Sequence, residues 1–238
     1  MNAPLFLQQS VSDSIELLRM MEPKEGYYLA FSGGKDSIVL YRLAELAGVR
    51  FDAHYNITTA DPPELVRFIR DTYPTVHRDR ASETMWTLIP RKLMPPTRLA
   101  RYCCEVLKER GGEGRVVLTG IRSAESTKRK HRRQVEPCNR KGKTLIHPIL
   151  RWTDSEVWSF VRSQGLAYCV LYDRGYKRLG CVGCPMSYNK RCELDAYPKI
   201  KAAYLRAFDR MLEERKKRGL VTTRWETAED VMEWWLSE

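Results

Sequence analysis

The sequence of 238 residues contains no apolar run long enough to cross a bilayer. Its first residues, Met1 to Pro4, lack the basic and apolar segments of a secretory signal peptide. We therefore expect a cytoplasmic protein with no membrane partner. The four histidines are scattered, and no pair of them has the spacing of a metal site. Internal repeats and low-complexity linkers are also absent, so the chain is predicted to form a single domain.

Acidic residues are fewer than basic residues in this sequence. The chain has 41 Lys and Arg against 30 Asp and Glu, a formal net charge of +11. Such a surplus favours a polyanionic partner beyond a small nucleotide. Two runs carry much of it, residues 128–133 (KRKHRR) and 213–218 (EERKKR). The second mixes signs, as a solvated helix face does. For the first, contact with nucleic acid or phosphate and a solvated loop both remain open.

The segment from Ser32 to Ser37 (SGGKDS) is the most informative part of the chain. It lies between the apolar run 27–31 and a helical pattern that begins at Ile38. A strand that breaks at glycines and re-enters as a helix aims backbone N–H groups at one point, where the helix dipole favours an anion. The alternative, an ordinary strand-to-helix turn, leaves Lys35 and Asp36 unexplained.

The segment therefore predicts a phosphate-binding loop in which the backbone and each side chain have different roles. Backbone N–H groups at Gly33 and Gly34 would face the phosphates, and the hydroxyls of Ser32 and Ser37 would add donors. Lys35 would supply a point charge, while Asp36 is the acid suited to hold Mg²⁺ against phosphate oxygens.

Strands and helices alternate along the first two thirds of the chain. Strands are predicted at 27–31, 50–56, 74–77 and 115–119, with helices at 12–21, 36–47, 62–72 and 97–110. This order predicts an α/β fold, a parallel twisted sheet flanked by helices, with ligands beyond the carboxyl ends of the strands. Later come a short strand at 147–150, a helix at 153–163, a Gly- and Cys-rich stretch at 170–192, and helices at 197–217 and 226–236. We expect a nucleotide-binding core over about 25–165, followed by a cysteine loop and C-terminal helices over about 166–238.

Seven cysteines in a reduced compartment favour metal or catalytic roles over disulfides. Cys103 and Cys104 are adjacent in a helical pattern, and Cys181 and Cys184 form a C-x-x-C turn. Neighbours on a helix diverge by about 100°, which suits one tetrahedral ion poorly and a larger cubane better. A [4Fe–4S] cluster is the favoured ligand, with zinc and simple packed thiols as alternatives.

Several segments resemble known families. The SGGKDS loop resembles the PP-loop of the adenine nucleotide α-hydrolases, which implies binding of ATP or a related adenine nucleotide and attack at its α-phosphate. Four further segments resemble, in order, the phosphoadenosine phosphosulfate (PAPS) reductase family. They are residues 101–108, 120–126, 148–158 and 171–184.

The adjacent cysteines and the later C-x-x-C are similar to those of the cluster-bearing adenylylsulfate reductases. That likeness implies that Cys103, Cys104, Cys181 and Cys184 ligate [4Fe–4S]. The family signature R-x-x-E-S likewise matches Arg122, Glu125 and Ser126, which implies nucleotide contact there and an arginine on the phosphate. On residues alone, this trio is also typical of an Arg–Glu pair in a loop.

One departure from the family bears on function. Those reductases act through a cysteine in a C-terminal E-C-G-L-H segment, whereas no cysteine follows Cys192 in this sequence. We therefore expect ATP-dependent adenylation coupled to transfer of sulfur from a donor, with nucleic acid as one acceptor. In this reaction Lys35, Asp36 and Arg122 would be the catalytic residues. The alternatives are a sulfonucleotide reductase with an atypical nucleophile, for which Cys192 between basic neighbours is the best candidate, and a non-catalytic nucleotide- or redox-sensing module.

Overall fold

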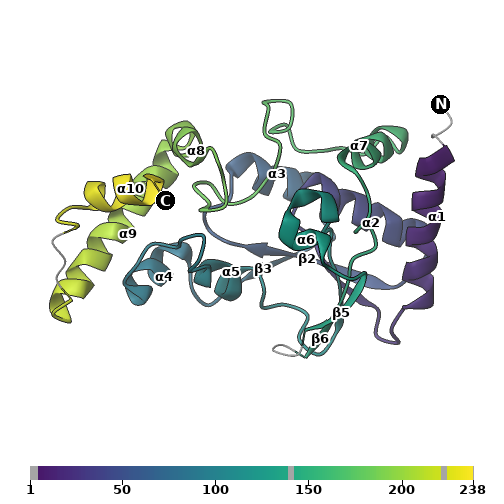
Figure 1. The fold of residues 1–238 in the computed structure, drawn as a ribbon, viewed down its shortest axis with the longest axis horizontal. Coiled ribbons are helices and arrows are strands. Elements are labelled where there is room, and N and C mark those ends of the chain that lie inside the picture. Colours follow the sequence, from purple (N-terminus) through teal and green to yellow (C-terminus); the bar gives the residue numbers. More distant parts are fainter. Residues whose placement is uncertain (1–4, 139–141, 221–223, 238) are drawn as a thin grey trace. The chain divides into compact units, whose positions relative to one another are not determined.

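The computed structural model describes residues 5–138, 142–220 and 224–237 (Figure 1). Contacts group the chain into two compact units. The first contains the residues up to 55 together with 64–79 and 111–179, and the second contains 56–63, 80–110 and 180–238. The two units are interleaved in the sequence, because two inner segments are grouped with the C-terminal part. The single domain with a nucleotide-binding core over about 25–165 stays a prediction.

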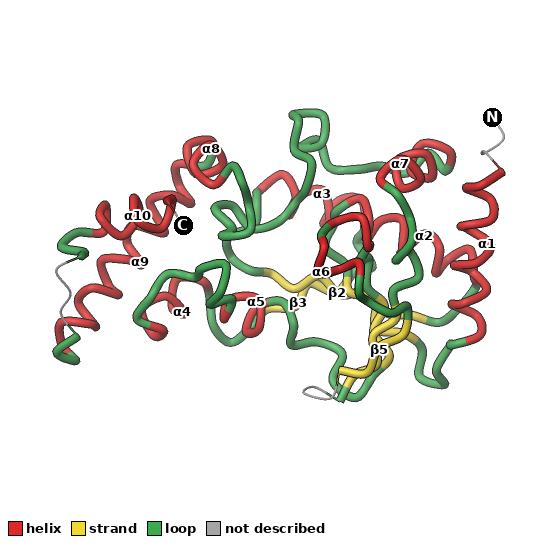
Figure 2. Tube along the Cα trace, in the orientation of Figure 1, coloured by secondary structure: helices red, strands yellow, loops and turns green. Residues whose placement is uncertain are grey.

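A six-stranded sheet runs through the first unit (Figure 2). Its strands are β1 (Tyr27–Ala30), β2 (Phe51–Ile57), β3 (His77–Arg80), β4 (Val116–Leu118), β5 (Val135–Cys138) and β6 (Lys143–Ile146). The strand order is β3-β2-β1-β4-β6-β5. β1 pairs in parallel with both β2 and β4, and β4 pairs in parallel with β6. β5 is antiparallel to β6. The carboxyl ends of β1 and β4 therefore open at the same edge, which places the segments that follow them side by side.

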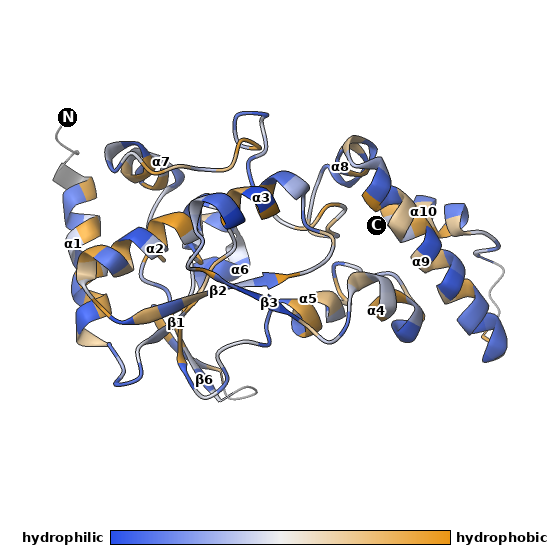
Figure 3. Ribbon diagram, turned by 180° about the vertical axis from the view of Figure 1, so that it is seen from behind, coloured by the Kyte–Doolittle hydropathy of each residue, from blue (hydrophilic) through white to orange (hydrophobic). Residues whose placement is uncertain are grey.

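Several helices accompany this sheet in the first unit. They are α1 (Leu5–Met20), α2 (Lys35–Ala47), α3 (Pro63–Thr72), α6 (Thr127–Lys130) and α7 (Asp154–Ser163), with a 3₁₀ turn, η1 (Ser123–Glu125). α2 contacts both α1 and α7; in Figure 1, α1 lies to the right of α2 and α7 above it. Its buried face includes Ile38, Leu40 and Leu43, and much of the helix is hydrophobic in Figure 3. This burial fixes the start of α2 directly after β1.

The second unit is helical in its described part. It contains α4 (Met85–Lys92), α5 (Tyr102–Leu107), α8 (Lys190–Ala196), α9 (Pro198–Lys217) and α10 (Ala228–Ser237). Tyr204 and Phe208 of α9 pack with Trp235 of α10 in a fully buried aromatic cluster. The end of α9 (EERKK) is hydrophilic in Figure 3, as its sequence predicts. No described helix of either unit combines the length and apolarity needed to cross a membrane.

Some predicted elements are wrong. The segment 147–150 is a turn closed by the Leu150 N–H on the His147 carbonyl, not a strand. The helix predicted at 97–110 is only α5, because Thr97 and Ala100 form a turn after Pro95 and Pro96. β3 begins three residues later than predicted, at His77. The β5–β6 hairpin and helices α4 and α8 were not predicted.

Candidate functional site

The segment from Ser32 to Ser37 forms the connection between β1 and α2. Gly33 has φ +70°, and a Cβ there would come within 2.7 Å of the Leu65 and Ile69 side chains of α3. Only glycine satisfies both constraints. The Ser37 hydroxyl donates to the Gly34 carbonyl at 2.8 Å and accepts the Ser32 N–H at 3.2 Å. Ser37 is buried, so its hydroxyl braces the loop from inside.

The start of α2 is not capped by a side chain of its own loop. Gly34 is the N-cap residue and provides no side-chain hydrogen bond. The Lys35 N–H instead donates to the Tyr172 phenol oxygen at 2.8 Å. A Cβ on Gly34 would lie 3.4 Å from that oxygen, so the tyrosine lies close across the loop. Burial raises the pKa of Tyr172, which keeps the phenol neutral.

Four charged side chains form a network beside this helix start. The Arg122 guanidinium donates from Nε to Asp36 Oδ1 at 2.5 Å and from Nη2 to Asp154 Oδ1 at 2.6 Å. Lys35 Nζ lies 3.2 Å from Asp36 and 3.3 Å from Asp154. Each cation therefore contacts both carboxylates. The Lys35 and Arg122 side chains are only 7% and 3% exposed, so their charges are largely withdrawn from water.

The pKa directions in this network follow from its ion pairs. Burial alone would raise the pKa of Asp154, but the charge of Lys35 and the hydrogen bond from Arg122 outweigh it and lower the pKa. Burial would lower the pKa of Arg122, and the charge and hydrogen bond of Asp36 reverse that effect. Asp154 and Arg122 are therefore both charged near neutral pH.

Arg122, Glu125 and Ser126 follow β4 and serve several local contacts. The third Arg122 contact is to the Trp152 carbonyl at 3.2 Å. Glu125 accepts the Arg122 backbone N–H at 2.9 Å and forms an ion pair with Arg129. Ser126 is the N-cap residue of α6. Glu125 and Ser126 therefore stabilise the turn after β4 in this structure. Their predicted contacts with a nucleotide stay predictions.

The four cysteines of the predicted ligand set all lie in the second unit. Cys103 and Cys104 belong to α5, and the turn of Cys181 and Cys184 is closed by the Cys184 N–H on the Cys181 carbonyl at 3.2 Å. Between them, Gly183 has φ +69°, and a Cβ there would approach Leu194 and Trp235 to 3.1 Å. The turn is therefore pressed against the aromatic core of its unit.

The thiols influence one another electrostatically. A hydrogen bond from Cys103, supported by Arg101 and Lys108 against the effect of burial, lowers the pKa of Cys104 to about 5. Its partner Cys103 is raised in pKa by that bond, by burial, and by the charges of Cys104, Cys181 and Cys184. Although Lys108 is partly exposed, its pKa is raised chiefly by Cys181. The four sulfurs thus share one neighbourhood with a cation beside them.

Within the described ranges, no group of three or more His, Cys, Asp or Glu side chains is gathered tightly enough to hold a single metal ion. The zinc alternative therefore gains no support from the geometry. A [4Fe–4S] cluster and the Mg²⁺ site at Asp36 stay predictions.

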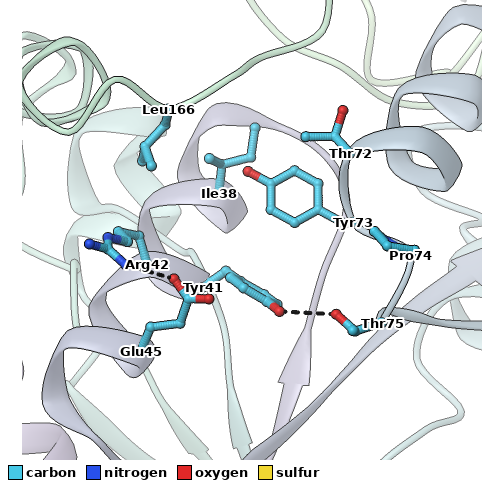
Figure 4. A pocket seen from close by; sticks show the side chains of 9 residues that line it. All are labelled: Ile38, Tyr41, Arg42, Glu45, Thr72, Tyr73, Pro74, Thr75 and Leu166. Carbon is cyan, nitrogen blue, oxygen red and sulfur yellow. Dashed lines mark hydrogen bonds and ion pairs between the residues drawn. The ribbon is translucent and has the colours of Figure 1, made fainter.

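A cavity of about 160 Å³ lies beside α2 (Figure 4). It is lined by Tyr41, Arg42 and Glu45 of α2, by residues 72–75, and by Leu166. Arg42 pairs with Glu45 at 3.1 Å, and Tyr41 shares a hydrogen bond with Thr75 at 3.2 Å. No residue of the Ser32–Ser37 loop lines it, so we do not assign the nucleotide to this cavity.

Three participants were not recognised from the sequence. In the sequence, Asp154 is explained as part of the capping box at the start of α7. Nothing near it indicates its contacts with Arg122, 32 positions earlier, and Lys35, 119 positions earlier. Tyr172 was noted only as a residue near the substrate entrance, without its hydrogen bond to the start of α2. Lys108, beside the thiols, also carried no local signal.

Residues 26–187 match the phosphoadenosine phosphosulfate reductase domain family. A protein named adenosine 5'-phosphosulfate reductase from Shouchella clausii (strain KSM-K16) is 26% identical over 195 residues, covering 72% of this chain and 77% of the relative. Another of that name, from Bacillus cereus (strain ATCC 14579), is 25% identical over 181 residues, covering 69% and 75%.

Two solved structures show the same fold. The PAPS reductase from Candida auris has a TM-score of 0.54 at 18% identity and covers 76% of this chain and 97% of its own. The Candida glabrata FMN adenylyltransferase, in complex with FAD and inorganic pyrophosphate, has a TM-score of 0.55 at 16% identity, covering 80% and 73%. The predicted α/β fold with a mostly parallel sheet is thereby confirmed.

Proposed function

Because this chain belongs to the phosphoadenosine phosphosulfate reductase family, we propose that it binds ATP or a related adenine nucleotide at Ser32–Ser37 and transfers the adenylyl group. An acceptor oxygen attacks the α-phosphorus, the bond to the β-phosphate oxygen breaks, and pyrophosphate leaves. A sulfur nucleophile then displaces AMP from the activated acceptor. The observation that carries this proposal is the pair of buried cations, Lys35 and Arg122, beside the start of α2.

The residues of this site suit charge stabilisation at a phosphorus. The start of α2 favours an anion, and Lys35 extends from its first turn. Arg122 holds Asp36 at 2.5 Å and so fixes that carboxylate beside the loop. Mg²⁺ is commonly held by one or two carboxylates plus phosphate oxygens, so Asp36 fits as its protein ligand. When bound, Mg²⁺ would neutralise phosphate charge during pyrophosphate release.

We further propose that Cys103, Cys104, Cys181 and Cys184 hold a [4Fe–4S] cluster. Support comes from the donor set, because the other three thiols all raise the pKa of Cys103, and Arg101 and Lys108 favour the thiolate of Cys104. When bound, the cluster would donate electrons or brace the loops that carry it. Iron and sulfide analysis of anaerobically purified protein should give about four irons per chain. Cys184→Ser should lower the iron content, and Cys169→Ser, a buried thiol of the other unit, should not.

The release of pyrophosphate and AMP gives the test of function. The protein with ATP, Mg²⁺, bulk RNA and sodium sulfide should release pyrophosphate and AMP in equal amounts. Asp36→Asn should slow this release about a hundredfold or more, the usual effect of removing one group that stabilises transition-state charge. Glu45→Gln, nine residues further along α2, is the matched control and should keep full activity. Release that survives Asp36→Asn would refute the role of Asp36.

The nucleic-acid acceptor rests on charge alone. In the basic run, Arg129 and Arg132 are already paired with Glu125 and Glu136. Omitting RNA from the assay tests this part separately. Pyrophosphate release that does not depend on RNA would move the acceptor to another class of molecule.

A sulfonucleotide reductase is the second candidate, favoured by the relatives named adenosine 5'-phosphosulfate reductase. The described cysteines of the first unit are Cys138 and Cys169. Cys169 is fully buried and burial raises its pKa, so it is a poor nucleophile. Sulfite release from adenylylsulfate, together with no pyrophosphate release from ATP, would establish the reductase and exclude our first choice.

A further inference from the structure

The four-membered charge network at the loop is unequal in its exposure to water. The side chains of Lys35, Arg122 and Asp36 are 7%, 3% and 21% exposed, whereas that of Asp154 is 66% exposed. Three members are therefore embedded, and one reaches in from the surface. Its carboxylate nevertheless contacts both cations, at 2.6 and 3.3 Å.

Asp154 is also the member that can leave without disturbing the fold. It is the first residue of α7, but the helix is capped by its neighbours. Thr153 Oγ1 accepts the Glu156 N–H at 3.2 Å, and Glu156 accepts the Thr153 N–H at 2.8 Å. A side-chain rotation of Asp154 thus leaves the capping box intact. Both cations would keep Asp36 as a contact, so neither is left without a carboxylate partner.

We propose that Asp154 is a displaceable counter-ion of the phosphate site. It neutralises Lys35 and Arg122 in the free protein, and a nucleotide phosphate replaces it beside them when the nucleotide binds. With Asp154 in place the four formal charges sum to zero. With it turned outward, the two cations and Asp36 leave a net charge of +1, which attracts phosphate. The proposal rests on the adenine-nucleotide binding proposed above and adds a residue that sets its strength.

The sign of the expected effect separates this role from a structural one. Asp154→Asn keeps the shape but removes the competing charge, so it should bind the non-hydrolysable ATP analogue AMPCPP, with Mg²⁺, about tenfold more tightly, a change of about 1.4 kcal/mol. The same variant should unfold at lower temperature without nucleotide, because Lys35 and Arg122 lose a partner. A residue that only supports the fold would lower stability and affinity together.

Isothermal titration calorimetry on the cluster-loaded protein measures both affinities, with Glu45→Gln as a control for the same change in net charge. Equal or weaker binding by Asp154→Asn, when the wild type binds, overturns the counter-ion role and leaves the proposed function standing. Failure of the wild type to bind any adenine nucleotide overturns both. If the variant does not fold, a wild-type structure with AMPCPP decides, since a retained 2.6 Å contact between Asp154 and Arg122 contradicts the proposal.

Discussion

Arg122 is a buried charged residue of the first unit with several polar contacts. Its guanidinium contacts Asp36, Asp154 and the Trp152 carbonyl while its side chain is 3% exposed. Removing one partner of a buried ion pair leaves the remaining charges uncompensated. The fork geometry of arginine also explains why one residue serves three acceptors.

We expect Arg122→Ala to lower the free energy of unfolding by about 3 kcal/mol or more, the range for broken buried pairs. Arg129→Ala provides the control, because its pair with Glu125 is partly exposed and such pairs contribute about 1 kcal/mol or less. Urea titration followed by circular dichroism measures both. Similar losses for the two variants would show that the Arg122 network contributes little to stability.

The same residues show what could be predicted at this scale. The sequence pointed to Lys35, Asp36 and Arg122, and the structure brings all three together. It gave no hint of Asp154, because a charged residue at a helix start is explained locally by capping and dipole effects. Only the fold reveals that its partners come from the loops after β1 and β4.

At the scale of elements, the turn between β1 and α2 depends on Gly33. We expect Gly33→Ala to destabilise the protein by about 2–5 kcal/mol, the sum of a left-handed backbone conformation and overpacking. Leu65 and Ile69 would have to move, since the new Cβ would lie 2.7 Å from each.

Gly48→Ala separates the two contributions. Gly48 has φ +69° at the end of α2, but a Cβ there meets nothing within 4 Å. Its cost should therefore be only the backbone part, about 1–2 kcal/mol. Thermal unfolding of both variants gives the comparison. Equal losses of stability would mean that Leu65 and Ile69 of α3 move aside at little cost and that their contact with Gly33 is not tight.

Element boundaries were predictable where apolar periodicity was strong and lost where it was weak. α2, α7 and α9 were predicted to within a few residues, since each has a clear buried face. α4 was missed because Pro90 lies within it, and β5 because its sequence (VEPC) contains a glutamate and a proline. β5 is an edge strand, where proline is tolerated.

At the scale of the whole molecule, the parallel order of strands was predictable, because helices between strands impose crossovers. The division into two interleaved units was not. Residues 56–63 and 80–110 belong with the C-terminal part through contacts of Ala60, Leu88 and Trp235 within one apolar cluster. Such long-range burial leaves no mark in local composition, so nothing in the sequence indicated the interleaving.

Acid should destabilise the protein through carboxylates that are paired in the fold. Asp52 of β2 is the clearest case, because the bidentate hydrogen bonds of Arg115, at 2.7 and 2.5 Å, outweigh burial and lower its pKa. Asp154, Glu136 and Glu156 are also lowered in pKa. A carboxylate with a lowered pKa stabilises the fold above its ordinary pKa, 3.8 for Asp and 4.5 for Glu, and the stabilisation is lost as the pH falls through the folded-state pKa.

We therefore expect the urea midpoint to stay level from pH 7 to about 5 and to fall steeply below about 4, near the ordinary carboxyl pKa. Asp52→Asn should cost about 1 kcal/mol at pH 7, since the pair is partly exposed, and its difference from the wild type should shrink below about pH 4, where Asp52 binds protons more strongly in the unfolded chain than in the fold. Asp13→Asn, which removes an exposed carboxylate of α1, should cost little at any pH. A difference between Asp52→Asn and wild type that stays constant down to pH 3 would mean that the lost packing of the side chain, and not its charge, accounts for the effect.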